Sequence, residues 1–335
     1  MEDPLISILI PVKNTAVFLP ECLASIQNQS YTNWEVLAID DHSTDLSATI
    51  LHSFAKDDDR IKVFKNEGTG IINALRKAYS LSSGELITRM DSDDIMTRDK
   101  LEIMAAKLKE KGKGHVAIGQ VKYFSDRGIS NGYERYESWL NLLTQTGNNY
   151  AEIYKECVIP SPCWMVFKED LDHCGAFDHD RYPEDYDLTF RFYETGLKCL
   201  PCDRVLHLWR DYDTRTSRTS EHYAQNYFLD IKLFYFLRLE FDNTRPLALW
   251  GAGNKGKTIA QGLIKEKLPF YWLCDNPKKI GKKIYDQEML HYSDLVGLND
   301  PQSIITVANE EAQSMIREYF TSLNKHPKND YFFFC

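Results

Sequence analysis

The first 125 residues alternate short apolar runs with stretches of helical periodicity, and this alternation limits the fold more than any other feature of the chain. Residues 5–12 are almost continuously apolar, which is typical of a strand buried on both faces of a parallel sheet. The same criteria predict further strands at 34–39, 61–64 and 85–90, and helices at 14–26, 44–55, 71–81 and 98–110. The pattern therefore predicts an α/β fold with an open sheet and a helix after each strand.

The composition limits the class of protein. The chain has 335 residues, 43% of them hydrophobic, which allows two domains with separate cores. Its net charge of −9 argues against general attraction to nucleic acid or anionic membranes, because both need a basic surface. The chain shows no signal-peptide pattern and no run of about 18 apolar residues, and its eight cysteines are scattered. We expect a cytoplasmic protein with reduced thiols and no membrane span.

Acidic clusters follow two of the predicted strands, at residues 40–45 (Asp-Asp-His-Ser-Thr-Asp) and 91–94 (Asp-Ser-Asp-Asp). Ligands of open α/β sheets bind outside the carboxyl ends of the strands. One interpretation is that these acids cap the helices that follow. However, the six carboxylates of these two clusters at neighbouring strand ends repel one another unless a positive charge lies between them. A divalent cation, Mg²⁺ or Mn²⁺, held by one or two of them together with substrate phosphates, is the other interpretation.

Three segments together, residues 8–14, 39–45 and 84–94, resemble the family 2 glycosyltransferases of the GT-A fold, and the resemblance covers about residues 4–240. It implies an inverting enzyme that moves a single sugar from a nucleoside diphosphate sugar, with UDP-sugar expected, to an acceptor hydroxyl. By this resemblance Asp91 and Asp93 form an Asp-x-Asp motif for Mn²⁺ or Mg²⁺, and Asp93 is the chief metal ligand. The residues implied for the donor are Pro11, Val12, Asn14, Asp41, Arg76, Asp91 and Arg210.

Two residues near this site, Arg76 and His207, keep an alternative. Arg76 reaches the diphosphate or is simply solvated. The segment that begins at Trp209-Arg210-Asp211-Tyr212 and continues through Arg215, Ser217 and Arg218 resembles a region that closes over donor phosphate in soluble members. His207 is a further metal ligand or, because it lies between two leucines, a packed strand residue.

A late acidic pair, Glu184 and Asp185, precedes a predicted helix that runs through Tyr193. An inverting transfer needs a carboxylate to accept the proton of the attacking hydroxyl, and the resemblance assigns that role to Asp185. The alternative is that the pair caps the helix. The acceptor contacts that we expect are Glu184, Trp164 and Trp139, although the aromatic stretch 125–160 could instead be a packed helical insertion.

A second unit begins after a polar linker at 242–246. Predicted strands at 247–250 and 270–273 flank a glycine-rich turn and a helix, and two more strands are expected at 304–307 and 331–334. Glycines in such a turn, with an acid about 20 residues later, are typical of dinucleotide binding. About 90 residues are too few for a complete dehydrogenase, so we expect a binding or docking module whose pocket is vestigial or takes a nucleotide. The candidate contacts are Gly251, Gly253, Gly256 and Asp275.

These inferences combine into one domain scheme. We expect a GT-A domain over 1–243, with a donor half at about 1–125 and an acceptor half at about 126–220, and a smaller Rossmann-like domain over 244–335. The two domains resemble a soluble subset of the family that includes the queuosine-tRNA galactosyltransferase group. The acceptor classes left open are therefore a glycan, a lipid-linked sugar, a small molecule and a tRNA nucleoside, and a homodimer is also allowed.

Two other classes of function stay open. A sugar-1-phosphate nucleotidyltransferase shares an α/β fold and acid-bound Mg²⁺, but it needs a glycine-rich basic loop after the first strand, and residues 11–14 (Pro-Val-Lys-Asn) are not one. A non-catalytic sensor would bind a nucleotide at residues 251–256 and turn over no nucleotide sugar.

Overall fold

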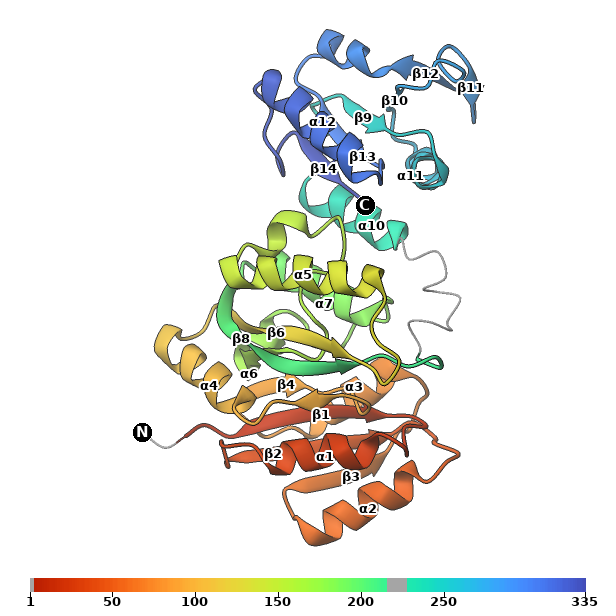
Figure 1. Cartoon of the computed structure of the whole chain (residues 1–335). Helices are drawn as coiled ribbons and strands as arrows, with labels where there is room; N and C mark the ends of the chain where they lie inside the picture. Colours follow the sequence, from red (N-terminus) through yellow and green to blue (C-terminus); the bar gives the residue numbers. More distant parts are fainter. Residues whose placement is uncertain (1–2, 216–227) are drawn as a thin grey trace. The chain divides into compact units, whose positions relative to one another are not determined.

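The computed structural model describes residues 3–215 and 228–335. The chain divides into two compact units, which we call the first unit (residues 1–150 and 158–219) and the second unit (residues 151–157 and 220–335). Both units are drawn in Figure 1. The predicted scheme placed residues 151–157 and the helix before the linker in the first domain, whereas in the structure both group with the second unit.

The first unit is built on one eight-stranded sheet with the strand order β3-β2-β1-β4-β7-β6-β8-β5. Strands β1 to β4 are parallel where they pair, β7 is antiparallel to both β4 and β6, and β8 is parallel to β6. The short β5 closes the edge antiparallel to β8. The strands are β1 (Ile6–Val12), β2 (Trp34–Asp40), β3 (Ile61–Lys65), β4 (Leu86–Arg89), β5 (Ile95–Met96), β6 (His115–Phe124), β7 (Trp164–Phe167) and β8 (Lys198–Arg210).

Helices follow the first four strands much as the periodicity predicts, so the α/β alternation of the first 125 residues is confirmed. Helix α3 has the predicted bounds, but α1 begins at Leu19 instead of 14, because Asn14 has a left-handed φ of 54° that a helix does not allow. The helices of the first unit are α1 (Leu19–Gln27), α2 (Ser47–Asp57), α3 (Ile71–Leu81), α4 (Lys100–Lys111), α5 (Asn131–Thr146), α6 (Lys168–His173) and α7 (Glu184–Glu194). A short 3-10 helix, Asn149–Glu152, begins in the first unit and ends in the second.

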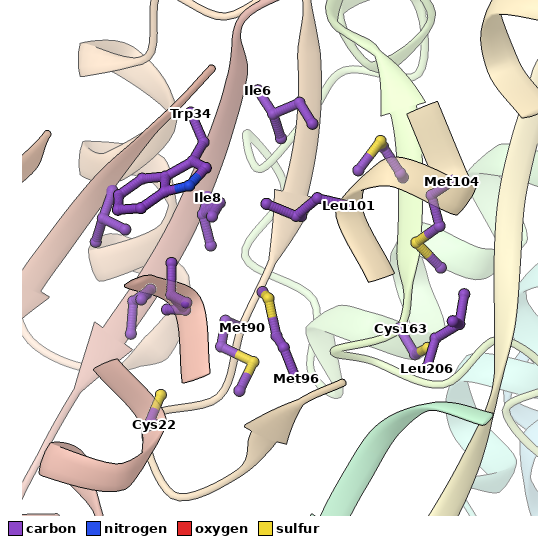
Figure 2. Packing of buried hydrophobic residues seen from close by; sticks show 14 of the residues in the cluster. Ile6, Ile8, Cys22, Trp34, Met90, Met96, Leu101, Met104, Cys163 and Leu206 are labelled. Carbon is purple, nitrogen blue, oxygen red and sulfur yellow. The ribbon is translucent and has the colours of Figure 1, made fainter. Parts of the chain in front are cut away.

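The core of the first unit is one apolar cluster that joins the sheet to α1 and α4. Figure 2 shows Ile6 and Ile8 of β1, Met90, and Leu101 and Met104 of α4 within this cluster. Burial of these side chains fixes which face of each strand points into the core. The parallel pairing of β1 to β4 brings their carboxyl ends to one edge of the sheet. Within residues 3–215 and 228–335, no helix combines the length and the apolar character needed to cross a bilayer.

A buried carboxylate helps to hold β1, β2 and β3 together. Glu35 accepts hydrogen bonds from Ser7 Oγ (2.6 Å) and from the backbone N–H of Ser83 (2.7 Å), and it pairs with Lys62 Nζ (2.7 Å). Burial alone would raise its pKa, but these donors lower the pKa from 4.5 to about 2. A carboxylate with a depressed pKa contributes stability that is present above its unfolded-state pKa and is lost as the pH falls toward the folded-state value.

We therefore expect Glu35→Gln to lower the free energy of unfolding by about 2 kcal/mol at pH 7, since Lys62 is half-exposed and its attraction is screened. The difference between wild type and variant should shrink as the pH falls from 4.5 toward 2, where the wild-type carboxyl also becomes neutral. Urea denaturation of both proteins at pH 7 and pH 3 measures this. An equal difference at both pH values would contradict the assignment.

The second unit contains a six-stranded sheet with the order β11-β12-β10-β9-β13-β14. Strands β12, β10, β9, β13 and β14 pair in parallel, and the edge strand β11 is antiparallel to β12. All four strands that the sequence predicts here are present within two residues of their expected bounds. The elements are α10 (Leu229–Leu239), β9 (Leu247–Trp250), α11 (Asn254–Lys265), β10 (Tyr271–Cys274), β11 (Lys283–Ile284), β12 (Gln287–His291), the 3-10 helix Tyr292–Gly297, β13 (Gln302–Ile305), α12 (Glu310–Ser322) and β14 (Tyr331–Phe333).

A buried lysine explains why residues 151–157 belong to this unit. Lys232 on α10 is 1% exposed, and its ammonium donates hydrogen bonds to the carbonyls of Lys155 (2.9 Å) and Phe334 (3.2 Å). Tyr154 packs its ring parallel to that of Phe334 at 5.5 Å. The segment is therefore bound to α10 and to the end of β14 by both polar and aromatic contacts.

Candidate active site

The Asp-x-Asp segment forms a turn at the end of β4, and it is not a helix cap. Strand β5 lies between residues 91–94 and α4, and α4 begins at Lys100 after its own N-cap, Asp99. The capping interpretation of this cluster is therefore wrong. The turn is held against the neighbouring segment by the hydrogen bond from Thr15 Oγ1 to Ser92 Oγ (3.0 Å). In the other cluster Asp45 accepts the N–H of Ser47 (2.9 Å), the first residue of α2, but the N-cap position of that helix is occupied by Leu46.

The carboxylates of Asp93 and Asp94 are held by the end of β8. Asp93 Oδ2 accepts a hydrogen bond from Tyr212 Oη (2.8 Å). Asp94 Oδ2 lies 3.0 Å from His207 Nε2, and its Oδ1 accepts the backbone N–H of Arg210 (2.8 Å). Burial, together with the negative charges of Asp94 and Asp91, raises the pKa of Asp93 to about 6. This carboxylate would gain from a nearby positive charge.

Arg89 joins the two acidic motifs. It is the last residue of β4, it is buried, and its guanidinium binds Asp91 Oδ1 through Nε (3.0 Å) and Nη2 (2.9 Å). Its Nη1 donates to Glu184 Oε1 at 2.9 Å. One planar cation thus fixes the distance between the Asp-x-Asp turn and the start of α7, a bridge that a lysine could not make with the same geometry.

We expect Arg89→Met to lower the free energy of unfolding by about 3–5 kcal/mol, because Asp91 and the buried Glu184 lose their shared counter-ion. Arg89→Lys should cost less, since one ammonium can still bind one of the two carboxylates. Urea denaturation at pH 7 gives both values. Equal stability of wild type and Arg89→Met would show that the bridge carries no energy.

Side-chain cations already neutralise part of the acidic cluster. Arg89 binds Asp91, Lys13 binds Asp41 (3.1 Å), and the carboxylates of Asp94 and Asp93 raise the pKa of Arg215 even though burial opposes it. The repulsion argument for a metal is therefore weaker than the sequence suggested. Among the described residues no group of three His, Cys, Asp or Glu side chains is arranged to hold a metal ion. Asp91 and Asp93 suit a Mg²⁺ or Mn²⁺ ion whose other ligands are substrate phosphates and water.

Asp41 lies at the end of β2 and is 3% exposed. Its Oδ1 accepts hydrogen bonds from Asn66 Nδ2 (2.7 Å) and from the N–H of Gly70 (3.0 Å), and Lys13 Nζ binds Oδ2. Burial would raise its pKa, but the hydrogen bonds from Asn66, Lys13 and Gly70 lower the pKa of Asp41 overall. The carboxylate is therefore ionised, and it ties residues 66–70 to the end of β1.

Three predicted donor contacts, Pro11, Val12 and Asn14, lie at or just after the end of β1, and they differ in what they can offer a donor. Val12 is 1% exposed in the apolar core, and its carbonyl accepts the N–H of Asp41, so its side chain cannot line a nucleoside pocket. Pro11 is partly exposed. Asn14 uses its Oδ1 to accept the N–H of Thr44 (2.8 Å), which joins the loops after β1 and β2. The prediction for Val12 is therefore corrected to a core role.

Asp185 lies in the first turn of α7, after Glu184, and the N-cap position is occupied by Pro183. The capping interpretation of this pair is therefore wrong. Asp185 is partly exposed, and its Oδ1 accepts the N–H of Tyr186 at 2.8 Å. Burial and the adjacent Glu184 raise the pKa of Asp185. A carboxylate with a raised pKa can accept a proton at neutral pH, whereas Glu184 is committed to Arg89.

Several predicted contacts lie elsewhere. Trp164 on β7 is 2% exposed with its ring edge-to-face against Phe192 (5.8 Å), so it is a core residue and cannot touch an acceptor. Trp139 on α5 is half-buried and packs against the core of the first unit. Arg76 is partly exposed, and it binds Asp180 Oδ1 (2.8 Å) and two carbonyls of the loop before α7.

Arg210 and His207 both form contacts with residues of the acidic turn 91–94. Arg210 Nε donates to the carbonyl of Asp93 (2.8 Å), and its guanidinium lies over the ring of Phe124 at 4.5 Å. His207 is fully buried with each ring nitrogen facing another side chain, so the metal-ligand interpretation is wrong and the packed-strand interpretation is confirmed. Ser217 and Arg218 lie outside the described residues.

Two cationic residues of the site, Arg89 and Lys100, were not predicted, although the sequence around each of them is unusual. Arg89 and Lys100 are charged residues in segments that are otherwise buried, at the end of a strand and at the start of an apolar helix face. Charged side chains are almost never fully buried unless they are paired. Their presence in such segments therefore predicts partners, although periodicity alone does not say which.

The three glycines predicted to contact a nucleotide, Gly251, Gly253 and Gly256, have different surroundings in the second unit. A Cβ on Gly256 would lie 2.0 Å from the carbonyl oxygen of Gly251, and one on Gly251 would lie 2.4 Å from Thr306 Oγ1, whereas a Cβ on Gly253 would meet nothing within 4 Å. Lys279 Nζ donates to the carbonyl of Ala252 (2.6 Å). Two of the three glycines are thus explained by close packing, and only Gly253 leaves open space beside the turn. Asp275 follows β10 and is exposed.

We expect Gly256→Ala to destabilise the second unit by about 3 kcal/mol, because backbone atoms must move to admit the methyl group. Gly253→Ala is the matched control, since it adds the same methyl to the same turn in open space and at a φ of −80°. It should change stability by less than about 0.5 kcal/mol. Thermal unfolding of the full chain measures both, and equal losses would contradict the packing explanation.

Comparison with known proteins supports a single family. Residues 7–175 match the model described as glycosyl transferase family 2. The glycosyltransferase GlyG of Streptococcus pneumoniae is 28% identical over 221 residues, which cover 64% of this chain and 73% of that protein.

Solved structures share the fold. TarS of S. aureus, in complex with UDP-GlcNAc, aligns with a TM-score of 0.54 at 19% identity and covers 77% of this chain and 71% of its own. The mannosyltransferase PcManGT of Pyrobaculum calidifontis, in complex with GDP-Man and Mn²⁺, aligns with a TM-score of 0.50 at 18% identity and covers 71% of this chain and 64% of its own. The predicted GT-A fold is confirmed.

Proposed function

The chain belongs to glycosyl transferase family 2, and from this premise we propose that it moves a single sugar from a nucleoside diphosphate sugar to an acceptor hydroxyl with inversion at the anomeric carbon. The observation that carries the proposal is the Arg89 bridge, which places the Asp-x-Asp turn and the start of α7 on either side of one guanidinium. Two acidic motifs held at a fixed separation suit two separate tasks in one reaction.

The first task concerns the donor. Asp91 and Asp93 would hold Mg²⁺ or Mn²⁺, which when bound stabilises negative charge on the departing diphosphate. Asp41 and Asn14 shape the edge of the sheet between β1 and β2, where we place the nucleoside. UDP is the expected nucleotide, and the UDP-GlcNAc complex of TarS and the GDP-Man and Mn²⁺ complex of PcManGT support a nucleotide-sugar donor in this fold.

The second task concerns the acceptor. Asp185 takes the proton of the acceptor hydroxyl while the hydroxyl oxygen forms its bond to the anomeric carbon and the bond to the diphosphate oxygen breaks. Its raised pKa suits that proton transfer. A surface cavity of about 390 Å³ is lined by His179, Asp180 and Arg181, in the loop that leads into α7. We place the acceptor there, and the acceptor class and a homodimer stay predictions from the sequence.

A binding screen of nucleoside diphosphate sugars with and without Mn²⁺, read by calorimetry, tests the proposal. We expect a UDP-sugar to bind with measurable heat only when Mn²⁺ is present, and transfer to be detected as UDP release. If the protein instead binds a nucleoside triphosphate and a sugar 1-phosphate, and no UDP-sugar, it is a nucleotidyltransferase. Binding of a nucleotide by the second unit without turnover of any nucleotide sugar would indicate a sensor.

A further inference from the structure

Three polar side chains form a chain of contacts in the core beneath the Asp-x-Asp turn. Lys100 on α4, His207 on β8 and Asp94 are each 0% exposed. Lys100 Nζ donates to the carbonyl of Pro162 (2.5 Å) and lies 3.4 Å from His207 Nδ1, and His207 Nε2 lies 3.0 Å from Asp94 Oδ2. Burying such groups costs free energy that apolar side chains of similar size would not cost.

The chemistry of this chain fixes the direction of its hydrogen bonds. An ammonium group can only donate, so Nδ1 of His207 is the acceptor of the Lys100 contact. The ring proton is therefore on Nε2, where it is donated to Asp94. Burial and the charge of Lys100 lower the pKa of His207, which agrees with a neutral ring that has one donor and one acceptor.

The far end of the chain of contacts reaches Asp93. With Oδ2 held by His207, Asp94 directs Oδ1 to the backbone N–H of Arg210 (2.8 Å). Arg210 Nε in turn donates to the carbonyl of Asp93 (2.8 Å), and two residues later Tyr212 Oη donates to Asp93 Oδ2 (2.8 Å). The end of β8 therefore orients the carboxylate of Asp93, and its own position depends on Asp94.

We propose that Lys100 and His207 are positioning residues which, through Asp94 and the end of β8, hold the Asp93 carboxylate in the orientation that binds the donor's metal ion. The inference rests on the proposed function in one respect, since it assigns Asp93 to the metal. Neither Lys100 nor His207 touches donor, metal or acceptor. Outer hydrogen bonds of this kind typically change metal affinity by about 10- to 100-fold.

The test compares two variants that differ in where an amide nitrogen lies. The side-chain nitrogen of His207→Gln can take the place of Nε2 and still donate to Asp94, whereas that of His207→Asn lies near Nδ1 and falls short. Asparagine is one methylene shorter than glutamine and leaves more space unfilled, so the melting temperature of each variant is measured beside its Mn²⁺ curve. We expect the Mn²⁺ concentration for half-saturation in the presence of UDP, read from the electron paramagnetic resonance of free Mn²⁺, to stay within about threefold for His207→Gln and to rise at least tenfold for His207→Asn. Equal curves for the two variants would overturn the proposal.

A second pair keeps the test decisive if His207→Asn does not fold. Asp94→Asn keeps the shape of the side chain but turns a donor toward the Nε2 proton, which breaks the contact. Adding His207→Gln lets the glutamine turn its carbonyl oxygen toward the new amide and restore it. We expect Asp94→Asn to raise the half-saturating Mn²⁺ concentration and to lower the melting temperature, and D94N/H207Q to recover most of both changes. No recovery in either measurement would overturn the proposal.

The ring of His207 can also be examined without any ligand. Nitrogen NMR of the wild-type protein should show a neutral His207 ring with its proton on Nε2, and a proton on Nδ1 would overturn the proposal whatever the protein binds. If wild type takes up no Mn²⁺ with UDP, the proposed function fails, while the NMR result and the melting temperature of D94N/H207Q still decide the positioning contacts.

Discussion

Replacing Asp185 by asparagine should lower the rate of sugar transfer by about 10³-fold and leave Mn²⁺-dependent donor binding within about threefold of wild type. The amide keeps the volume of the carboxylate and can still accept the N–H of Tyr186, so α7 keeps its first turn. What it loses is the ability to accept a proton. Because the donor motif lies on the other side of Arg89, donor binding should be spared.

Single-turnover assays of transfer, together with calorimetric titration of the donor in the presence of Mn²⁺, separate these two effects. Glu169→Gln is a matched control, since it neutralises an exposed carboxylate on α6, outside the acidic motifs of the site. It should transfer sugar at the wild-type rate. Retention of transfer by Asp185→Asn would remove Asp185 from the base role, and loss of donor binding would place it on the donor side instead.

The local part of the fold could be predicted because it depends on local patterns. A buried strand such as β1 is a continuous apolar run, and α3 repeats its apolar residues at helical spacing, so both appear in a window of a few residues. The ends of the parallel strands could also be inferred, because the chain direction decides which residues come last. The positions of Asp41 and Asp91 after neighbouring strands follow from that.

The middle of the chain could not be predicted in the same way. Strand β6 carries Gln120 and Lys122 among apolar residues, and the sheet is completed by its pairing with β8, about 80 residues later. Pairings of this kind depend on side chains that are distant in sequence. Trp164 illustrates the consequence, since an aromatic residue between two acidic motifs suggested an acceptor contact, whereas β7 lies between β4 and β6 in the sheet and buries it.

Partners of charged groups were the least predictable feature of the site. The sequence showed too many carboxylates for one edge of a sheet and suggested a metal ion as the remedy. In the structure Asp91 is paired with the residue two positions before it, and Asp94 with residues more than 100 positions away. The number of acids is visible in a sequence, but the division of cations among them is a property of the folded chain.

Because the cations are divided unequally among the acids of the turn, we expect a large loss of metal-dependent donor binding when Asp93 is replaced. Among the acids of the turn, Asp91 is bound by Arg89 and Asp94 by His207 and the backbone of Arg210, whereas Asp93 accepts one neutral hydrogen bond, from Tyr212. Its raised pKa reflects burial beside two like charges, which outweigh the nearby charge of Arg215 and the hydrogen bond from Tyr212. A carboxylate in that condition gains most from a divalent cation, so Asp93 is the residue on which metal-dependent donor binding should depend.

Asp93→Asn should therefore weaken Mn²⁺-dependent binding of the donor by about 10²-fold and reduce transfer by at least as much. Tyr212 can still donate to the amide oxygen, so the turn keeps its shape, and removal of one of several crowded negative charges should leave stability unchanged or slightly raised. Calorimetric titration with and without Mn²⁺ and urea denaturation measure the two quantities.

Tyr212→Phe is the companion variant, because it removes the same hydrogen bond and keeps the Asp93 charge. It should affect donor binding far less than Asp93→Asn does. If the two variants lose affinity equally, the hydrogen bond and not the charge is what the donor site needs. If Asp93→Asn binds the donor as wild type does in Mn²⁺, the assignment of Asp93 as the chief metal ligand fails.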